Sequence, residues 1–208
     1  PTLPAWLSLV DNGNGTATLT GTPTNAEVGN RNVTLRVSDG TSSADQVFVV
    51  VVANINDAPV FTSVAVTAAT EDVLYTYNIV TADADLGDTL TITAPTLPAW
   101  LSLVDHGDGT ATLSGTPLNA NVGIHNITLR VNDGTVNVDQ VFTVTVANVN
   151  DVPTDIALSN NIVAEGLLAG TTVGTFSTID PDLSDTFTYS FCGGPDDGSF
   201  QIAGNILQ

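Results

Sequence analysis

The chain has 208 residues and a formal net charge of −19, from 22 acidic side chains, three arginines and no lysine. This charge balance excludes nucleic-acid binding and disfavours anionic membrane surfaces, because few cationic groups are present to neutralise phosphates. The single cysteine, Cys192, excludes an intrachain disulfide framework and a multi-cysteine zinc site. It is either a small, partly buried residue or a point of intermolecular linkage. No apolar run is long enough to insert into a bilayer.

Length and composition indicate several all-β domains. The chain exceeds one typical domain, and 42% of its residues are apolar, which is enough to form real cores. Valine and threonine recur throughout, both of which favour strands, and no window shows a sustained helical period. The 18 glycines and 10 prolines predict many turns between the strands.

A long internal repeat organises the sequence. Residues 1–59 return as residues 95–153, with 43 of the 59 positions identical and no gap. Tandem similarity at a period of 94 residues predicts an array of folded modules, each the size of a β-sandwich domain. Each copy ends in a linker, Asn54–Pro59 or Asn148–Pro153, where proline stops strand pairing.

The linkers define the expected domain frame. In chain order, residues 1–57 are the C-terminal part of one module, residues 58–152 form a complete module, and residues 153–208 are the N-terminal part of a further module. A half-sandwich would expose its core and its unpaired strand edges. We therefore expect either that the chain continues beyond both ends or that neighbouring chains complete the halves by strand addition.

The complete module is expected to contain about seven strands. Ile127, Leu129 and Val131 alternate with polar neighbours, so each strand has one buried and one solvated face, as in a sandwich of two sheets. The expected strands lie near residues 60–67, 72–80, 88–94, 99–104, 110–114, 124–131 and 138–147.

The acidic residues are almost all aspartates: 19 Asp against three Glu. Short carboxylates in turns suit hard cations such as Ca²⁺, which prefer oxygen ligands. Aspartate is also a common turn residue without any metal, so composition alone leaves both interpretations open.

Several motifs together resemble a known family. The linkers Asn54–Pro59 and Asn148–Pro153 resemble the cadherin inter-domain linker, and Asp83-Ala84-Asp85 resembles its Asp-x-Asp turn. The Leu-Pro-x-Trp-Leu and Gly-Thr-Pro segments resemble dystroglycan-type, cadherin-like Ig modules of large bacterial surface adhesins. This resemblance implies tandem Ig-like or cadherin-like Greek-key β-sandwich modules placed end to end. Further matches are Val37–Gly40, Val131–Gly134, Asp180–Asp182, Glu71 and Glu165.

The resemblance implies Ca²⁺ at the two junctions. At the first, the ligands would be Asn54, Asn56 and Asp57 from the linker and Asp83, Asp85 and Asp133 from the complete module. At the second, they would be Glu71, the linker residues Asn148, Asn150 and Asp151, and Asp180 and Asp182 from the next module. Asp72, Asp88 and Asp185 lie close enough in sequence to join these sets or to support them.

Two departures from the cadherin pattern lower the expected number or strength of the ions. Asn54 and Asn148 stand where cadherin linkers usually begin with Asp. The Asp-Arg-Glu motif of the family is not evident. Asn25 and Glu27 in the first copy, and Asn119 and Asn121 in the second, lie near its place.

Catalysis is not expected. His106 and His125 replace Asn12 and Arg31 of the first copy, so one copy lacks them, and no nucleophile triad, zinc spacing or phosphate loop is found. The sequence instead predicts a non-enzymatic, extracellular, Ca²⁺-binding repeat segment that acts as a stalk, spacer or cell-adhesion element of a large surface protein. Its partners would be neighbouring repeats of the same chain, with homotypic assembly or a glycan or cell-surface ligand as further options. Two alternatives remain, a subunit of an extracellular filament or sheath, and a carbohydrate-binding module with an exposed Trp100.

Overall fold

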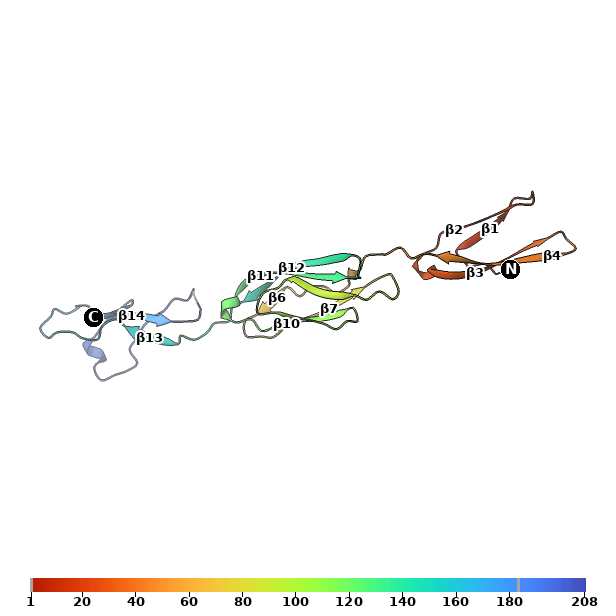
Figure 1. Ribbon diagram of the computed structural model, residues 1–208. Coiled ribbons are helices and arrows are strands. Elements are labelled where there is room, and N and C mark those ends of the chain that lie inside the picture. The colour runs from red at the N-terminus through yellow and green to blue at the C-terminus, as the bar shows by residue number, and fades with distance from the viewer. Residues whose placement is uncertain (1, 183) are drawn as a thin grey trace. The chain divides into compact units, whose positions relative to one another are not determined.

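The structure is a computed structural model in which residues 2–182 and 184–208 are described (Figure 1). The chain divides into two compact units. One unit comprises residues 1–67, 76–114 and 126–143, and the other comprises residues 68–75, 115–125 and 144–208. Each unit contains one of the two linkers whole. In the described ranges, no helix is long and apolar enough to cross a membrane.

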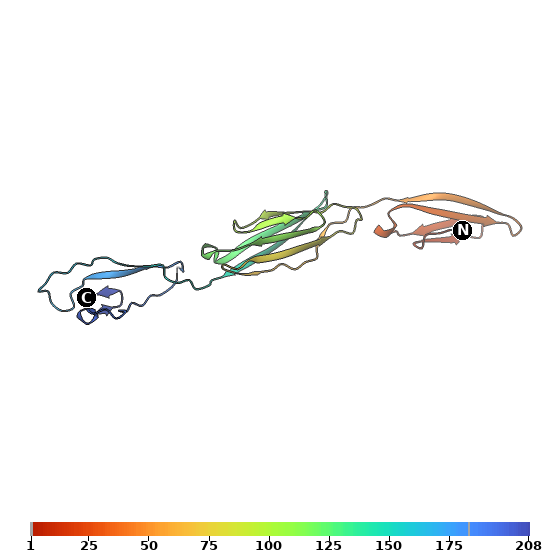
Figure 2. The ribbon, with the colours of Figure 1, turned by 90° about the horizontal axis from the view of Figure 1, so that it is seen from below.

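The first segment, residues 1–57, forms two β-hairpins (Figures 1 and 2). Strand β1 (Leu7–Asp11) pairs antiparallel with β2 (Ala17–Gly21), through a turn in which two glycines have positive φ angles. Strand β3 (Gly29–Ser38) pairs antiparallel with β4 (Ser43–Val52) over its whole length, and the short 3-10 helix η1 (Asn25–Glu27) precedes β3. Within the described residues, each hairpin is a two-stranded sheet, and Thr2 forms a single antiparallel bridge with Thr34 of β3.

The middle segment, residues 58–152, forms two four-stranded sheets with the orders β5-β7-β10-β9 and β6-β12-β11-β8. This arrangement confirms the expected β-sandwich. The strands are β5 (Val60–Phe61), β6 (Ala68–Thr70), β7 (Tyr75–Ala82), β8 (Thr91–Thr96), β9 (Ser102–Asp105), β10 (Thr110–Gly115), β11 (Gly123–Asn132) and β12 (Asn137–Ala147), with the 3-10 helix η2 (Asn119–Asn121) before β11.

Alternation in the sequence places the core of the middle segment. In β7, Tyr75, Tyr77 and Ile79 are buried and their neighbours are exposed. In β11, every second residue from Ile127 to Val131 is buried, as the sequence predicted. Each such side chain contributes roughly 1.5–3 kcal/mol when it is fully buried. The two inner faces therefore supply the apolar burial that holds this segment together.

The start of the middle segment differs from the expected pattern. The single strand predicted over residues 60–67 is strand only at its start, in β5, and the next strand, β6, begins after its end and belongs to the other sheet. Thr62 and Ser63 both donate backbone N–H groups to the carbonyl of Val80, which marks the point where the chain leaves the β5–β7 pairing. The next strand begins only at Tyr75, because Asp72 has a left-handed φ of 57° that cannot continue a strand.

The third segment, residues 153–208, contains one four-stranded sheet in the order β13-β14-β16-β15. These strands are β13 (Asp155–Leu158), β14 (Gly174–Ile179), β15 (Ile202–Ala203) and β16 (Ile206–Leu207), with the 3-10 helix η3 (Asp197–Ser199) before β15. Gly174 is required by a close approach, since a Cβ there would lie 2.4 Å from the carbonyl oxygen of Asn160. Cys192 is exposed, which disagrees with the partly buried interpretation.

Candidate metal centre

The first linker is tied to acidic residues of the middle segment. The backbone N–H of Asp57 donates to Asp85 Oδ2 at 2.6 Å, and the side-chain amide of Asn56 donates to Asp133 Oδ2 at 2.9 Å. Both contacts lie within one compact unit. Proline at position 59 holds the preceding residue extended, which keeps the linker from folding back. The linker therefore runs alongside the carboxylates of Asp85 and Asp133.

The turn after β7 gathers three aspartates. Asp83 Oδ1 accepts the backbone N–H of Asp85 at 2.8 Å, and the N–H of Asp88 approaches the carbonyl of Asp85 at 3.4 Å. These bonds bend the chain so that carboxylate oxygens of all three residues lie within 4.8 Å of one another. The sequence pattern Asp-x-Asp-x-x-Asp is thus a local device for concentrating negative charge.

The second junction repeats this turn in the third segment. Asp180 Oδ1 accepts the N–H of Asp182 at 2.8 Å, and oxygens of Asp180, Asp182 and Asp185 again lie within 4.8 Å. The backbone N–H of Asp151 donates to Asp182 Oδ2 at 2.6 Å, as that of Asp57 does to Asp85. The two junctions therefore share one construction, although the third segment is not a close copy of the middle one.

A second acidic group at this junction brings together residues far apart in sequence. Oxygens of Glu71, Asp151 and Asp182 lie within 4.8 Å of one another, so Asp182 belongs to both groups. Glu71 is only 2% exposed and Asp182 only 4%. Glu71 Oε2 also accepts the backbone N–H of Val149 at 3.2 Å, which fixes it against the linker.

Hydrogen bonds lower the pKa values of two carboxyls, those of Asp182 and Asp133. The N–H of Asp151 is the main cause of the lowered pKa of Asp182, with Asn148 and Asn119 as further donors. The amide of Asn56 is the main cause of the lowered pKa of Asp133, followed by backbone donors in the same turn. Both groups are therefore held in the charged form that binds a cation.

Asp88 shows the opposite shift. Partial desolvation raises the pKa of its carboxyl, and the negative charges of Asp85, Asp83 and Asp133 raise it further. The charged form of Asp88 is thus disfavoured by the cluster around it. This is the electrostatic signature of carboxylates crowded together without a compensating positive charge.

Within the described residues, the clusters also contain buried carboxylate oxygens with no hydrogen-bond partner: Asp83 Oδ2, Asp85 Oδ1 and Asp180 Oδ2. Burying such an oxygen without a donor is costly. The side chains of the chain offer little compensation, because it has no lysine and each arginine is engaged elsewhere. Arg31 donates to backbone carbonyls of residues 26–28, Arg36 pairs with Asp45, and Arg130 pairs with Asp139.

These features fit Ca²⁺. The oxygen atoms near the two linkers belong to carboxylates, asparagine side chains and backbone carbonyls. These are the ligands that Ca²⁺ takes. The orphaned oxygens of Asp83, Asp85 and Asp180 supply contacts that the protein itself leaves unused. The three acidic groups would hold the ion or ions, and no cysteine or histidine belongs to any of the groups.

The predicted ligands are brought together to different degrees. Asp83 and Asp85 share one group, and Glu71, Asp151, Asp180 and Asp182 lie in the two overlapping groups at the second junction. Asn56, Asp57 and Asp133 are linked to their junction by hydrogen bonds, and Asn148 bonds to Asp182. Asn150 donates to the backbone of Asp151, its own linker neighbour, and Asn54 is exposed on the linker. The assignment of these residues as ligands stays a prediction.

Two asparagines outside the predicted ligand set hold the linker aspartates. The amide of Asn25 donates to Asp57 Oδ2 at 2.6 Å, and that of Asn119 donates to Asp151 Oδ2 at 3.3 Å and to Asp182 Oδ1 at 3.1 Å. Asn119 also lines an open cavity of about 710 Å³ with Asn148, Pro181 and Ser184. The signal that could have identified them is the repeat, because Asn25 and Asn119 occupy the same position in the two copies.

Comparison with known proteins places the fold. The sequence profile of the family described as "Putative Ig domain" (He_PIG) matches residues 1–53 and 58–147. No match is found among curated proteins.

Solved structures show similar folds. Mouse protocadherin-24 EC1-3 aligns with a TM-score of 0.52 and 18% identity over 98% of this chain and 72% of that one. Human protocadherin-24 EC1-2 aligns with a TM-score of 0.53 and 21% identity over 73% and 77%. An endo-fucoidan hydrolase of glycoside hydrolase family 107 is 31% identical over 70% of this chain, with a TM-score of 0.42, and the present chain spans only 22% of its length. The family match and the two protocadherin folds confirm tandem cadherin-like and Ig-like sandwiches.

Proposed function

Because the chain belongs to the He_PIG family of Ig domains, we propose that it is a non-enzymatic, extracellular run of sandwich modules whose junctions bind Ca²⁺. In this proposal, residues 1–57 are the C-terminal part of one module, residues 58–152 a complete module and residues 153–208 the N-terminal part of the next. The run serves as a spacer or adhesion element of a larger surface protein, and its partners are the adjoining repeats.

The observation that carries the proposal is the state of the carboxylates at the two linkers. Asp85 is 5% exposed and Asp182 is 4% exposed, yet each lies among other acids that have orphaned oxygens. Like charges so close together repel one another in the metal-free protein. A divalent cation would convert this repulsion into attraction, so that binding and stiffening of the linker become one event.

Calcium titration of the metal-free chain tests the proposal. Extracellular modules bind Ca²⁺ with Kd values on the order of 10⁻⁴–10⁻³ M, and we expect affinity in that range by calorimetry. At a free Ca²⁺ concentration of about 100 times Kd, the free energy of unfolding should rise by roughly 2.7 kcal/mol per site. Mg²⁺ should act more weakly, because it requires near-ideal octahedral geometry. Equal melting temperatures in EDTA and in Ca²⁺, with no binding heat, would refute the Ca²⁺ role.

The spacer role needs a second measurement, because binding alone does not prove stiffening. Small-angle X-ray scattering should show a larger maximum dimension and less spread between conformers in Ca²⁺ than in EDTA. A single substitution, Asp196→Asn, removes one negative charge from an exposed position outside the acidic groups and is the matched control. If Ca²⁺ binds but the scattering profile is the same in Ca²⁺ and in EDTA, the metal site is real and the spacer function is refuted.

A further inference from the structure

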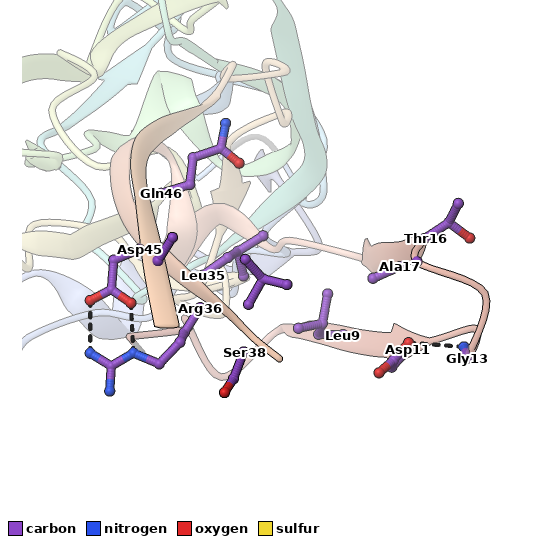
Figure 3. Close-up of a pocket in the computed structure, with 13 residues that line it drawn as sticks. Leu9, Asp11, Gly13, Thr16, Ala17, Leu35, Arg36, Ser38, Asp45 and Gln46 are labelled. Atoms are coloured by element: carbon purple, nitrogen blue, oxygen red, sulfur yellow. Dashed lines mark hydrogen bonds and ion pairs between the residues drawn. The ribbon is translucent and has the colours of Figure 1, made fainter. Parts of the chain in front are cut away.

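The turn between β1 and β2 contains two reactive dipeptides. Asn12-Gly13 and Asn14-Gly15 are the only Asn-Gly pairs in the sequence. In such a pair, the backbone nitrogen of glycine can attack the side-chain carbonyl carbon of asparagine, because glycine has no Cβ to shield that nitrogen. The turn borders an open cavity of about 590 Å³ between the two hairpins of the first segment, and Figure 3 shows Gly13 and Thr16 at the tip. The turn is therefore open to a chemical change that needs no partner except water.

The side-chain carbonyl of Asn14 is polarised. Its Oδ1 accepts the backbone N–H of Thr16 at 3.1 Å and the hydroxyl of Thr16 at 2.6 Å. Two donors on one carbonyl oxygen stabilise the negative charge that forms on Oδ1 when Cγ is attacked. Within the described residues, the N–H of Gly15 has no hydrogen-bond partner, and a Cβ built at Gly15 would meet no atom within 4 Å. The attacking nitrogen is thus free, and the carbon that it attacks is activated.

Asn12 is held in the opposite way. Its side-chain nitrogen donates to the hydroxyl of Thr16 at 2.9 Å, and its Oδ1 accepts no hydrogen bond from the part of the chain that the structure describes. The N–H of Gly13, which would have to attack Asn12, donates to Asp11 Oδ1 at 2.9 Å, as Figure 3 shows. The nucleophile of this pair is therefore bound to a neighbour, and the carbonyl lacks the two donors present at Asn14.

The second copy of the repeat shows that an aspartate fits this position. Asp108 corresponds to Asn14, and its Oδ1 accepts the N–H of Thr110 at 3.0 Å and the hydroxyl of Thr110 at 2.6 Å. The hydroxyl of Thr110 is the main cause of the lowered pKa of Asp108, followed by the N–H. Asp108 is exposed in the middle segment, as Asn14 is in the first. A carboxylate at position 14 would therefore keep the hydrogen bonds of the turn and add one negative charge to it.

We propose that Asn14 is a self-modification site that converts to aspartate in the folded protein, with water as the only co-reactant. In the first step, the nitrogen of Gly15 bonds to Cγ of Asn14 and the bond from Cγ to Nδ2 breaks. The proton of that nitrogen leaves with Nδ2 as ammonia, and a succinimide ring remains. In the second step, water adds to Cγ, the bond from Cγ to the nitrogen of Gly15 breaks, and the nitrogen regains a proton. No atom is oxidised or reduced, and neither Ca²⁺ nor the acidic groups at the linkers take part.

The hydrogen bonds of the turn also favour one product of ring opening. Attack of water at Cγ restores an ordinary main chain, whereas attack at the main-chain carbonyl carbon of residue 14 gives isoaspartate, whose main chain runs through Cβ and Cγ. The donors of Thr16 polarise Cγ and not the main-chain carbon, so they favour the first route. Isoaspartate would also lose the pair of bonds that Asp108 makes in the second copy. We therefore expect aspartate to be enriched in the product of the folded chain.

Incubation of the full chain in EDTA at mildly alkaline pH tests the proposal. Peptide mapping by mass spectrometry, in water enriched in the heavy oxygen isotope, detects each conversion as a labelled oxygen on the modified residue. In the folded chain, Asn14 should convert at least about fivefold faster than Asn12, because only Asn14 has the two donors and the free nitrogen. In urea, the two rates should become similar, because these hydrogen bonds are lost. No conversion of Asn14, or equal rates at both asparagines in the folded chain, overturns the proposal.

Thr16→Val separates activation from simple exposure of the turn. The variant removes the hydroxyl donor but keeps the backbone donor and the shape of the side chain, so conversion of Asn14 should slow by about threefold or more. A purely structural role of the hydroxyl would give the opposite result, because a loosened turn converts faster. The matched control is Thr110→Val, which removes the equivalent hydroxyl from the second copy and should leave the rate at Asn14 unchanged. Faster conversion of Asn14 in Thr16→Val than in the control contradicts the proposal.

The ratio of products gives a test that needs no variant and holds even if Thr16→Val disturbs the hairpin. Electron-based fragmentation of the mapped peptide distinguishes aspartate from isoaspartate at position 14. The ratio of aspartate to isoaspartate should be at least about twofold higher in the folded chain than in urea, because the donors of Thr16 act on Cγ only in the folded turn. The same ratio in both states overturns the role assigned to the turn.

Discussion

The backbone N–H of Asp151 donates to Asp182 Oδ2 at 2.6 Å, and the N–H of Asp57 donates to Asp85 Oδ2 at the same distance. A linker residue and an Asp-x-Asp turn are joined in the same way at both junctions. Three further oxygens of the two turns, Asp83 Oδ2, Asp85 Oδ1 and Asp180 Oδ2, are buried without a hydrogen-bond partner within the described residues. The linker–turn bond is thus the geometric basis of both candidate sites.

Asp182→Asn should weaken Ca²⁺ binding at the second junction by at least about tenfold, equivalent to roughly 1.4 kcal/mol. Asp182 is the member common to two acidic groups, so its charge contributes to both. The substituted amide keeps an oxygen that can accept the N–H of Asp151, so the fold should survive. Calorimetric titration measures the change, with Asp196→Asn as the control. Equal affinities for the two variants would contradict a role for Asp182 in holding the ion.

The acidic turns at the two junctions could be predicted from the sequence, because their contacts are made between residues that are close together along the chain. Asp83 and Asp85 are two residues apart and hydrogen-bond within their own turn, so the motif alone predicts the cluster. Alternation in β11 predicts which of its residues are buried, because each strand has one face toward the core. These features depend on neighbours along the chain.

Features that depend on distant partners could not be predicted in this way. Asn119 contacts Asp182, 63 residues away, and no periodicity marks that contact. Residues 60–67 look like one strand, but only Val60 and Phe61 pair with β7, and the chain then crosses to the other sheet, where β6 pairs with β12. The left-handed turn at Asp72, whose N–H donates to the carbonyl of Pro117, likewise depends on a distant loop.

Asn119→Ala should lower Ca²⁺ affinity at the second junction by roughly 10-fold, the lower end of the effect of residues that orient metal ligands. The amide of Asn119 bonds to both Asp151 and Asp182, and its loss frees both carboxylates to separate. The matched variant is Asn25→Ala, which should affect the first junction only, since Asn25 bonds to Asp57. Site-resolved NMR titration distinguishes the junctions. A loss at both sites from either variant would indicate a general effect on folding.

Asp88→Asn should have opposite effects with and without Ca²⁺. The pKa of Asp88 is raised, so its contribution to stability is present below the ordinary Asp pKa and is lost as the pH rises through the raised value. At neutral pH in EDTA, the variant should therefore melt at a higher temperature than the parent, and this advantage should shrink as the pH falls below the ordinary pKa. In saturating Ca²⁺, the variant should instead lose part of the metal-induced stabilisation. Thermal melts of the variant and the parent, in EDTA at several pH values and in saturating Ca²⁺, make these comparisons. A variant that is less stable than the parent in EDTA at pH 7 would contradict the crowding of charge.

Leu129→Ala and Leu35→Ala compare one position in two environments. Leu129 is fully buried in the middle segment, and its truncation should cost about 2–5 kcal/mol of unfolding free energy. Leu35, its repeat counterpart, is half-buried beside the open cavity, so truncation there removes fewer contacts and should cost less. Urea denaturation followed by exchange at residues within each segment measures both values.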